Sequence, residues 1–425
     1  MKIAIVGTGI SGLGAAYLLR RVHEVDLFEK DAWIGGHSHT VVVNGQPVDT
    51  GFIVYNERNY PYLTRLFAEL GVETIPSDMS FGVYNPGTRM AYSSRGLKGL
   101  LARPANLLSP SFYRMVRDIF RFNREALAAL DDESAAELTL GQFLQQRGFS
   151  TAFERGYITP MSAAIWSSPP GRTLDFPAQT FFRFFRNHGL LSTSPDIPWR
   201  TVKGGSQTYV EALIRPIADR VHVRCPVRAI RRTDTGVRLS FTDGPDREYD
   251  HVIIATHADQ ALRLLADPTE EETRLLARFP YQTNRVVLHS DDIVLPPYRR
   301  AWASWTVRMP APGEQVDALM MTYDMNRLQS IPGPQPYLVT LNPDSRWLAM
   351  HEQAPFGSRM IHYQTDYEHP AYTTESFRLQ SQLQGLNQHG RRTHFCGAYF
   401  GYGFHEDGLR SGVEVAAALG VEWGG

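Results

Sequence analysis

Glycines that expose the peptide backbone follow directly after the first apolar run of the chain. The run Lys2–Val6 fits a strand buried on both faces of a parallel sheet, and Gly-Thr-Gly-Ile-Ser-Gly occupies residues 7–12. Such glycines let the backbone approach a pyrophosphate, while the N-terminus of the following helix directs its amides at the phosphates. Glu29 comes 22 residues after Gly7, where its carboxylate can accept hydrogen bonds from both hydroxyls of a ribose. This chemistry predicts a dinucleotide site for FAD or NAD.

The elements that would position these residues form a βαβ unit followed by a hairpin. A helix is expected over residues 10–20 and a second strand over residues 24–29. A second glycine pair, Gly35-Gly36, comes next, and the expected strands Thr40–Val43 and Gln46–Asp49 flank an Asn-Gly turn. An NAD unit would normally continue into another βαβ crossover, so the hairpin favours FAD.

Five motifs, in order along the chain, carry a resemblance to a known family. They are the N-terminal segment through Asp49-Thr50-Gly51, the Gly-Gly turn at 201–207, the strand-like segments 223–230 and 252–256, and the glycine-rich segment 394–412. Together they resemble the amine oxidase and phytoene desaturase superfamily of FAD enzymes. The runs G-G-H-S-H-T and F-C-G-A-Y-F-G-Y-G-F-H-E-D-G are similar to those of bacterial predicted FAD-binding proteins encoded beside cyclopropane-fatty-acyl-phospholipid synthases.

The resemblance implies an α/β fold in which a Rossmann-like FAD-binding domain is interleaved with an α+β substrate domain containing an antiparallel sheet. The FAD-binding domain would comprise residues 1–57, 200–262 and 390–425, and the substrate-binding domain residues 58–199 and 263–389. Patterns within the substrate domain predict helices over residues 60–70, 112–130, 139–147 and 172–187, and strands over residues 285–289, 301–307, 318–324 and 337–341.

Cofactor contacts implied by the resemblance come from all three blocks of the FAD-binding domain. In that family the C-terminal helix directs its N-terminus at the flavin pyrimidine carbonyl, where the helix dipole stabilises negative charge on reduced flavin. His37 and His39 stand where relatives carry an arginine that contacts the phosphates, and an imidazole is a weaker anchor. The implied contacts are Gly7, Gly9, Ile10, Ser11, Gly12, Glu29, Lys30, Gly35, Gly36, His37, Thr50, Gly51, Phe52, Val227, Ala255, Gly397, Ala398, Asp407, Gly408 and Leu409.

Four residues are candidates for chemistry on the substrate side. Tyr399 could wall the substrate pocket, and His405 or Glu406 could move a proton. The alternative is that Glu406 and its neighbour Asp407 only form hydrogen bonds with cofactor or backbone. Asn284 stands where many amine oxidases carry a lysine near flavin N5. An amide can orient a water but supplies no charge, which disfavours direct amine oxidation.

Charge and cysteine usage bear on partners and compartment. The 425-residue chain has 43 Lys and Arg against 44 Asp and Glu, so no global field would recruit nucleic acid. Two cysteines, Cys225 and Cys396, fit a reducing cytoplasm. The first strand leaves no room for a signal peptide, and no apolar segment reaches the roughly 18 residues of a membrane span. We expect a cytoplasmic protein, with the arginine-rich segment 101–130 either solvated or in peripheral contact with the inner face of the membrane.

These features together predict an FAD-dependent oxidoreductase with a hydrophobic substrate. Residues 163–166 and 181–186 are strongly apolar, which suits either a channel for a lipid acyl chain or ordinary helix packing. The expected reaction is a desaturase- or dehydrogenase-type hydride transfer to flavin N5. The alternatives are a flavin-dependent amine oxidase, a non-redox isomerase, and a lipid-binding accessory protein that retains FAD. No metal is expected, because His37 and His39 lack an evident third ligand, and the oligomeric state is left open.

Overall fold

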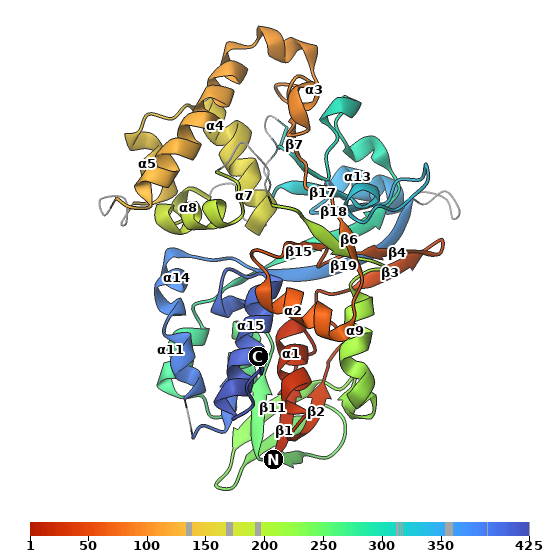
Figure 1. Cartoon of the computed structure of the whole chain (residues 1–425), viewed down its shortest axis with the longest axis vertical. Coiled ribbons are helices and arrows are strands. Elements are labelled where there is room, and N and C mark those ends of the chain that lie inside the picture. Colours follow the sequence, from red (N-terminus) through yellow and green to blue (C-terminus); the bar gives the residue numbers. More distant parts are fainter. Residues whose placement is uncertain are drawn as a thin grey trace.

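The computed structural model describes residues 1–132, 138–166, 173–191, 197–311, 314, 316, 318–352, 360–388 and 390–424. Two unlike halves follow one another along the long axis of the molecule (Figure 1). The half that holds both termini contains a parallel sheet with helices against it, and the other half contains a larger sheet and a group of helices. The chain passes between the halves several times, so each half is assembled from separated segments.

A five-stranded parallel sheet forms the centre of the first half. Its strand order is β10-β2-β1-β14-β20, and β1 pairs in parallel with both β2 and β14. The strands are β1 (Lys2–Val6), β2 (Glu24–Phe28), β10 (Val221–His222), β14 (His251–Ile254) and β20 (Thr393–Phe395). They come from three separated parts of the sequence, so the sheet needs all three parts to form.

Both faces of this sheet are buried, each against a different layer. Ile3 and Ile5 pack in one core with helices, whereas Ala4 and Val6 belong to the core shared with a small antiparallel sheet. This burial on two sides explains why the first strand is apolar from Ile3 to Val6. The covering elements are α1 (Ile10–Leu19), α9 (Gln207–Ile214) and α15 (His405–Ala418) on one face, and β11 (Val227–Arg232), β12 (Val237–Phe241) and β13 (Arg247–Tyr249) on the other.

A seven-stranded sheet, antiparallel except for one pair, dominates the second half. Its order is β19-β15-β18-β17-β16-β7-β8, and only β16 and β7 run parallel. The expected antiparallel sheet is therefore confirmed. The strands are β7 (Phe81–Asn85), β8 (Met90–Ser93), β15 (Tyr281–His289), β16 (Trp305–Arg308), β17 (Met320–Asp324), β18 (Leu338–Leu341) and β19 (Ile361–Pro370).

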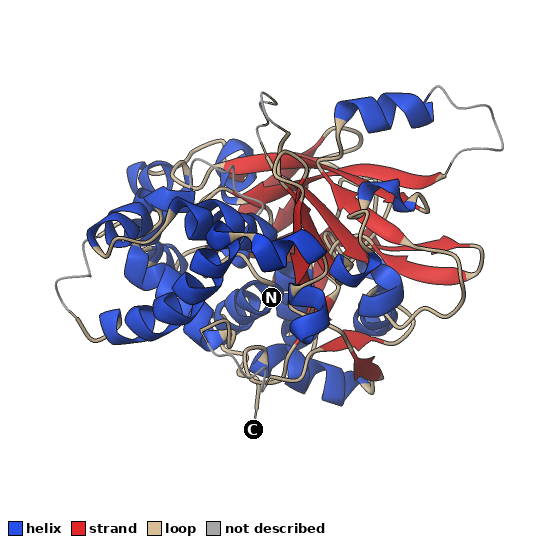
Figure 2. Ribbon diagram, turned by 90° about the horizontal axis from the view of Figure 1, so that it is seen from above, coloured by secondary structure: helices blue, strands red, loops and turns tan. Residues whose placement is uncertain are grey.

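Helices gather on one side of the large sheet (Figure 2). They are α3 (Gly96–Leu100), α4 (Pro110–Ala129), α5 (Leu140–Gln146), α6 (Thr151–Phe153), α7 (Thr159–Trp166) and α8 (Ala178–Asn187). Phe122 of α4 lies against Phe181, Phe182 and Phe185 of α8, all of them buried. This part of the apolar segment 181–186 is therefore helix packing.

Shorter elements connect the two halves. The hairpin of β3 (Thr40–Val43) and β4 (Gln46–Asp49) has the predicted bounds, and a third small sheet joins β5 (Val54–Tyr55), β9 (Arg200–Val202) and β6 (Thr74–Pro76). The remaining helices are α2 (Pro61–Leu70), α10 (Ala258–Leu264), α11 (Glu270–Leu276), α12 (Met325–Leu328), α13 (Ser345–Glu352) and α14 (Thr374–Gln380).

Among the described residues, no helix is both long enough and apolar enough to span a bilayer.

Some element bounds differ from the sequence-based expectations. The expected strand over 223–230 begins only at Val227, because Arg224 adopts a left-handed φ of 49° and Pro226 follows. The expected strand over 301–307 begins at Trp305, after a 3₁₀ turn. The helix expected over 172–187 begins at Ala178, and residue 172 lies outside the described residues. No expected strand covered β19.

Candidate active site

A long cleft of about 830 Å³ opens at the carboxyl ends of β1, β2 and β14. Its size is near the upper end of the roughly 300–1,000 Å³ found for ligand pockets. All three predicted blocks of the FAD-binding domain contribute to its wall. The predicted cofactor residues that line it are Gly7, Gly9, Ile10, Ser11, Glu29, Lys30, Gly35, Gly36, His37, Val227, Ala255, Gly397, Ala398 and Gly408.

The glycine-rich turn leaves bare backbone facing this cleft. A Cβ added at Gly9 would meet no atom within 4 Å, so space for a ligand lies directly beside the main chain. Gly7 has a φ of 104°, and a Cβ there would lie 2.6 Å from the carbonyl oxygen of Ala255. Gly12 does not line the cleft but packs against the carbonyl of Gly7. The turn thus presents amides to a ligand and holds α1 close to the sheet.

Glu29 holds its carboxylate at the edge of the cleft in a fixed orientation. It accepts hydrogen bonds from the backbone nitrogen and the hydroxyl of Thr8, at 3.1 and 2.5 Å, and from the backbone nitrogen of Asp31 at 3.1 Å. The carboxylate has further lone pairs, which can accept ribose hydroxyls as predicted.

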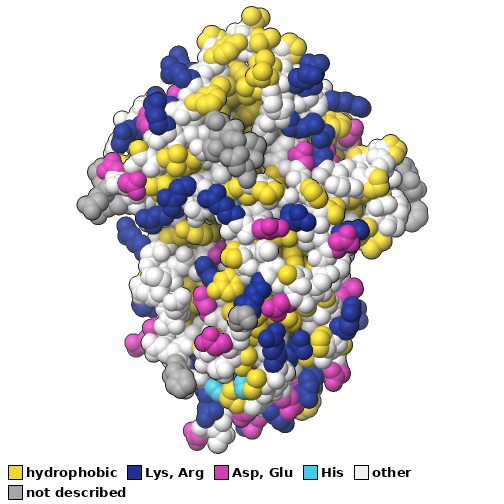
Figure 3. Space-filling view, in the orientation of Figure 1, with side chains coloured by type: hydrophobic (Ala, Val, Ile, Leu, Met, Phe, Trp, Pro, Cys, Tyr) yellow, Lys and Arg dark blue, Asp and Glu magenta, His cyan; other side chains and the backbone are white. Residues whose placement is uncertain are grey.

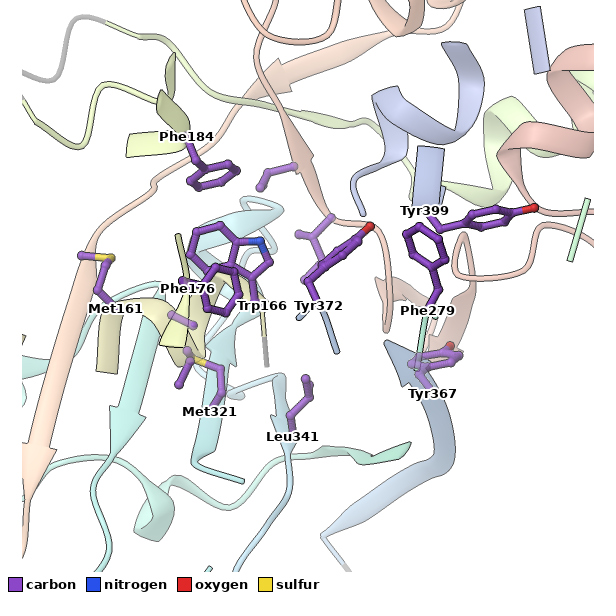
Figure 4. Close-up of a cluster of buried hydrophobic side chains, with 14 of the residues drawn as sticks. Met161, Trp166, Phe176, Phe184, Phe279, Met321, Leu341, Tyr367, Tyr372 and Tyr399 are labelled. Carbon is purple, nitrogen blue, oxygen red and sulfur yellow. The ribbon is translucent and has the colours of Figure 1, made fainter. Parts of the chain in front are cut away.

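Tyr399 supplies an independent sign that the cleft is built for a polar ligand. Its ring lies against Phe279, and its hydroxyl points away from Tyr372 and Trp166 (Figure 4). The hydroxyl is buried and has no hydrogen-bond partner among the described residues. A buried hydroxyl normally has a partner, so this one fits a bound cofactor in the cleft. Tyr399 lines this cleft and not the second cavity described next, which differs from its predicted place in the substrate pocket.

A second cavity of about 290 Å³ adjoins the cleft. Most of its wall is apolar, and none of the described residues that line it is Asp, Glu, Lys or Arg. Phe184 belongs to this wall, so the apolar segment 181–186 serves both helix packing and the cavity. The apolar side chains are Phe52, Ile53, Val54, Met79, Phe81, Met161, Ala164, Ile165, Phe184, Leu190, Trp199, Val286, Trp305, Leu341 and Phe404.

Three imidazoles and a phenol line the junction where the cleft meets the second cavity. His37 stacks on His369 with ring centroids 5.2 Å apart, and Tyr367 approaches the edge of His37 at 4.9 Å. Burial, aided by neighbouring His257, lowers the pKa of His369 to about 4. Burial likewise lowers the pKa of His37 well below its usual range. The junction therefore carries no imidazolium charge at neutral pH.

His405 is the third imidazole at the junction. It stacks on Phe52 with centroids 3.9 Å apart, and its Nε2 lies 2.6 Å from the hydroxyl of Tyr209. Burial lowers the pKa of His405 to about 3, so its ring is a weak base. The ring thus faces both cavities while its Nε2 is held by Tyr209. The proton-moving role predicted for His405 stays a prediction.

Asn284 lines neither cavity but contacts His369, which lines both. Its Nδ2 lies 2.9 Å from Nδ1 of His369, and its Oδ1 accepts a hydrogen bond from Asn342 at 2.8 Å. Because an amide N–H can only donate, Nδ1 of His369 accepts and Nε2 carries the proton. Asn284 is thus a positioning residue for His369.

The two carboxylates at the start of α15 both accept hydrogen bonds from backbone amides. Glu406 accepts hydrogen bonds from the amides of Tyr62 and Leu63, at 2.8 and 3.0 Å, where α2 begins. Asp407 accepts from the amides of Tyr402 and Phe404 where α15 begins. Neither residue lines the cleft or the second cavity. This geometry matches the alternative in which both residues bind backbone, although burial raises the pKa of Glu406 to about 7.

The other predicted cofactor residues lie beside the cleft. Thr50, Gly51 and Phe52 line the second cavity, and the hydroxyl of Thr50 lies 2.8 Å from that of Tyr367. Leu409 packs against Gly14, where α15 crosses α1. Among the described residues, no group of three His, Cys, Asp or Glu side chains could hold a metal ion.

Sequence reasoning missed the contribution of β19. Tyr367 and His369 come from this strand, and both line the cleft and the second cavity. A usable signal existed, because β-branched and aromatic residues alternate with polar ones from Ile361 through Tyr367. His257, which stacks on Tyr281 at the wall of the cleft, carried no comparable signal.

Comparison with known proteins agrees with this geometry. The sequence profile of flavin-containing amine oxidoreductases matches residues 10–292. A putative flavin-containing monoamine oxidase of Mycobacterium tuberculosis is 29% identical over 282 residues, which are 63% of this chain and 59% of that protein. The chain thus matches less than two thirds of that relative's length.

Solved structures share the fold. Wild-type putrescine oxidase bound to putrescine has a TM-score of 0.69 at 16% identity, with 99% of each chain covered. A fatty acid isomerase from P. acnes, described as producing CLA, has a TM-score of 0.67 at 16% identity, with 96% of each chain covered. The chain belongs to the flavin-containing amine oxidoreductase family, and FAD is the cofactor that its cleft fits.

Proposed function

We propose that this chain is an FAD-dependent oxidoreductase that dehydrogenates a hydrophobic substrate, with a lipid acyl chain as the preferred class. The observation that supports this proposal is the second cavity, whose described lining residues include no charged side chain. An acyl chain gains about 25 cal/mol for each Å² of apolar surface that leaves water. A substrate ammonium buried there would find no carboxylate among the described lining residues and would lose its hydration.

Residues of the junction have separate roles in this proposal. Bound FAD would supply the two-electron acceptor. The neutral rings of His37 and His369 would keep charge away from the reacting carbon, and Asn284 would fix the tautomer of His369. The start of α15 would place its amides toward the cofactor, since Gly408 lines the cleft.

Anaerobic stopped-flow with the purified holoprotein tests the proposal. Saturated and monounsaturated acyl phospholipids and free fatty acids are one set of substrates, and putrescine is the amine control. Loss of the oxidised flavin band with an acyl substrate, together with a product of one further double bond by mass spectrometry, is expected. Reduction by putrescine alone would instead establish the amine route. A shifted double bond without net flavin reduction would establish the isomerase, and the absence of any product would overturn the enzymatic proposal.

A variant pair ties the test to the cavity. Ile165→Asp places a carboxylate on the wall of the second cavity, whereas Ile165→Val keeps the wall apolar. Reduction by an acyl substrate is expected to fail in the first variant and to persist in the second. Equal rates in both variants would mean that the substrate does not use this cavity.

A further inference from the structure

One segment of the chain is basic throughout, although the whole chain is nearly neutral. Residues 79–117 contain six Lys and Arg and no Asp or Glu, whereas the complete chain has 43 basic and 44 acidic residues. The segment contains α3, the 3₁₀ helix Pro104–Leu108 and the first part of α4. These elements form the end of the molecule opposite the N-terminus (Figure 1). The positive charge is therefore concentrated at one end of the long axis.

The same end exposes large apolar side chains. Leu97 is 76% exposed, Leu107 50%, Leu108 87% and Tyr113 52%. They come from three consecutive elements, and Tyr113 donates a hydrogen bond to the carbonyl of Leu107 at 3.0 Å, which ties α4 to the 3₁₀ helix. Figure 3 shows hydrophobic side chains gathered at this end with Lys and Arg on both sides. Isolated exposed leucines are ordinary, but a contiguous group framed by cations marks an interaction surface.

Several of the Lys and Arg side chains around these apolar residues have no carboxylate partner among the described residues. Arg95, Lys98 and Arg114 are exposed and form no ion pair there, whereas Arg117 lies 3.6 Å from Asp118. The turn Arg299–Ala301, which contacts α3, adds further arginines. The free cations are available to a partner with negative charge.

We infer that this apolar and basic end, formed by Leu97, Leu107, Leu108 and Tyr113 with Arg95, Lys98 and Arg114, binds the surface of an anionic lipid bilayer. The leucines would enter the boundary between headgroups and acyl chains, and the cations would contact lipid phosphates. Tyr113 suits the same depth, because its ring is apolar and its hydroxyl is polar. A second copy of the chain fits this surface poorly, since a two-fold contact would bring its unpaired cations together. The inference is independent of the reaction in the cleft.

Co-sedimentation of the full-length, FAD-loaded protein with vesicles tests this inference. The vesicles are phosphatidylcholine alone, or phosphatidylcholine with phosphatidylglycerol at a ratio of about 3:1. We expect binding to the anionic vesicles to be about tenfold tighter or more, and to weaken as salt rises. Equal binding to both vesicles, or binding to neither, would overturn the inference.

Matched variants locate the surface. Leu97→Asp with Leu108→Asp is expected to weaken binding to anionic vesicles by about 100-fold or more. The control pair Val22→Asp with Val42→Asp changes two other apolar residues that are mostly exposed, at 66% and 68%, outside the segment, and should bind as wild type does. The pair Lys98→Gln with Arg114→Gln keeps the leucines and should lose the preference for anionic lipid. An unchanged flavin spectrum checks that each variant is folded.

Two outcomes would contradict the surface assignment. Equal loss in the control pair would show that added negative charge, and not this end of the molecule, reduces binding. Light scattering without vesicles provides the second check. If the wild-type protein is a dimer and the Leu97→Asp with Leu108→Asp variant is a monomer, the surface is a contact between two copies of the chain.

Discussion

The cleft and the second cavity lie side by side but are built in opposite ways. The cleft presents backbone at Gly7 and Gly9, with a fixed carboxylate at Glu29, so its chemistry depends on main-chain conformation. The second cavity presents side chains from α7, α8 and the large sheet, and its chemistry depends on their volume and lack of charge. The lining of the cleft thus comes from short motifs, whereas the lining of the second cavity comes from packing between distant segments.

The largest expected effect comes from Gly9→Ala, which tests whether the bare backbone of the glycine-rich turn binds the cofactor. Gly9 has a φ of −65°, and an added Cβ meets no protein atom within 4 Å, so the chain itself should fold unchanged. The methyl group would occupy the space of the pyrophosphate, and we expect FAD affinity to fall about 100-fold or more. Titration of apoprotein with FAD measures this. Gly385→Ala is the control, because its added Cβ would lie 3.7 Å from Oε1 of Glu271, an ordinary contact, and Gly385 does not line the cleft. Full FAD affinity in Gly9→Ala would show that the pyrophosphate does not lie against the backbone at Gly9.

The second largest effect concerns the wall of the second cavity. Ile165→Asp should leave FAD bound, because Ile165 lines only the second cavity. An unpaired carboxylate there should lower kcat/KM for an acyl substrate by about 100-fold or more. Flavin content and steady-state rates are measured on the same sample, with Ile165→Val as the control. Loss of FAD along with activity would show that the two cavities are not separable.

A smaller effect is expected at the junction. Asn284→Asp places a carboxylate beside Nδ1 of His369, which favours the charged imidazole and raises its pKa from about 4. The shift in pKa is measured by NMR titration of the histidine ring. Because the proposal needs a neutral His369 ring, kcat/KM for an acyl substrate should fall about tenfold. Asn342→Gly removes the outer hydrogen bond to Asn284 and suits the left-handed φ of 49° at this position, so it should move the pKa less. An unmoved pKa in Asn284→Asp would remove the positioning role.

A further effect concerns stability in mild acid. Folded His369 has a pKa of about 4, below the ordinary value of 6.5, so the unfolded chain binds a proton more readily between these values. Acidification from pH 6.5 to 4 should therefore favour unfolding, by up to about 1.4 kcal/mol per pH unit for this group. His369→Gln removes that contribution, and its free energy of unfolding should depend less steeply on pH in urea titrations. Parallel curves for both proteins would contradict the buried, neutral state of His369.

Local patterns were sufficient to predict the cofactor half. Strand β1, the hairpin of β3 and β4, and most glycines of the cleft follow from turn chemistry within a few residues. The junction was not predictable in this way, because His369 and Asn284 meet only through the register of β15 with β19. The helix-capping use of Glu406 likewise depends on α2, which lies 343 residues earlier at Leu63.

One ladder of hydrogen bonds forms part of both cavities. Tyr281 and Thr283 of β15 line only the cleft, Val286 lines only the second cavity, and Tyr367 and His369 of β19 line both. Evolution or engineering that enlarges the second cavity by changing β19 would therefore also disturb the cofactor. New substrate ranges should arise first on α7, whose Met161 and Ala164 line only the second cavity.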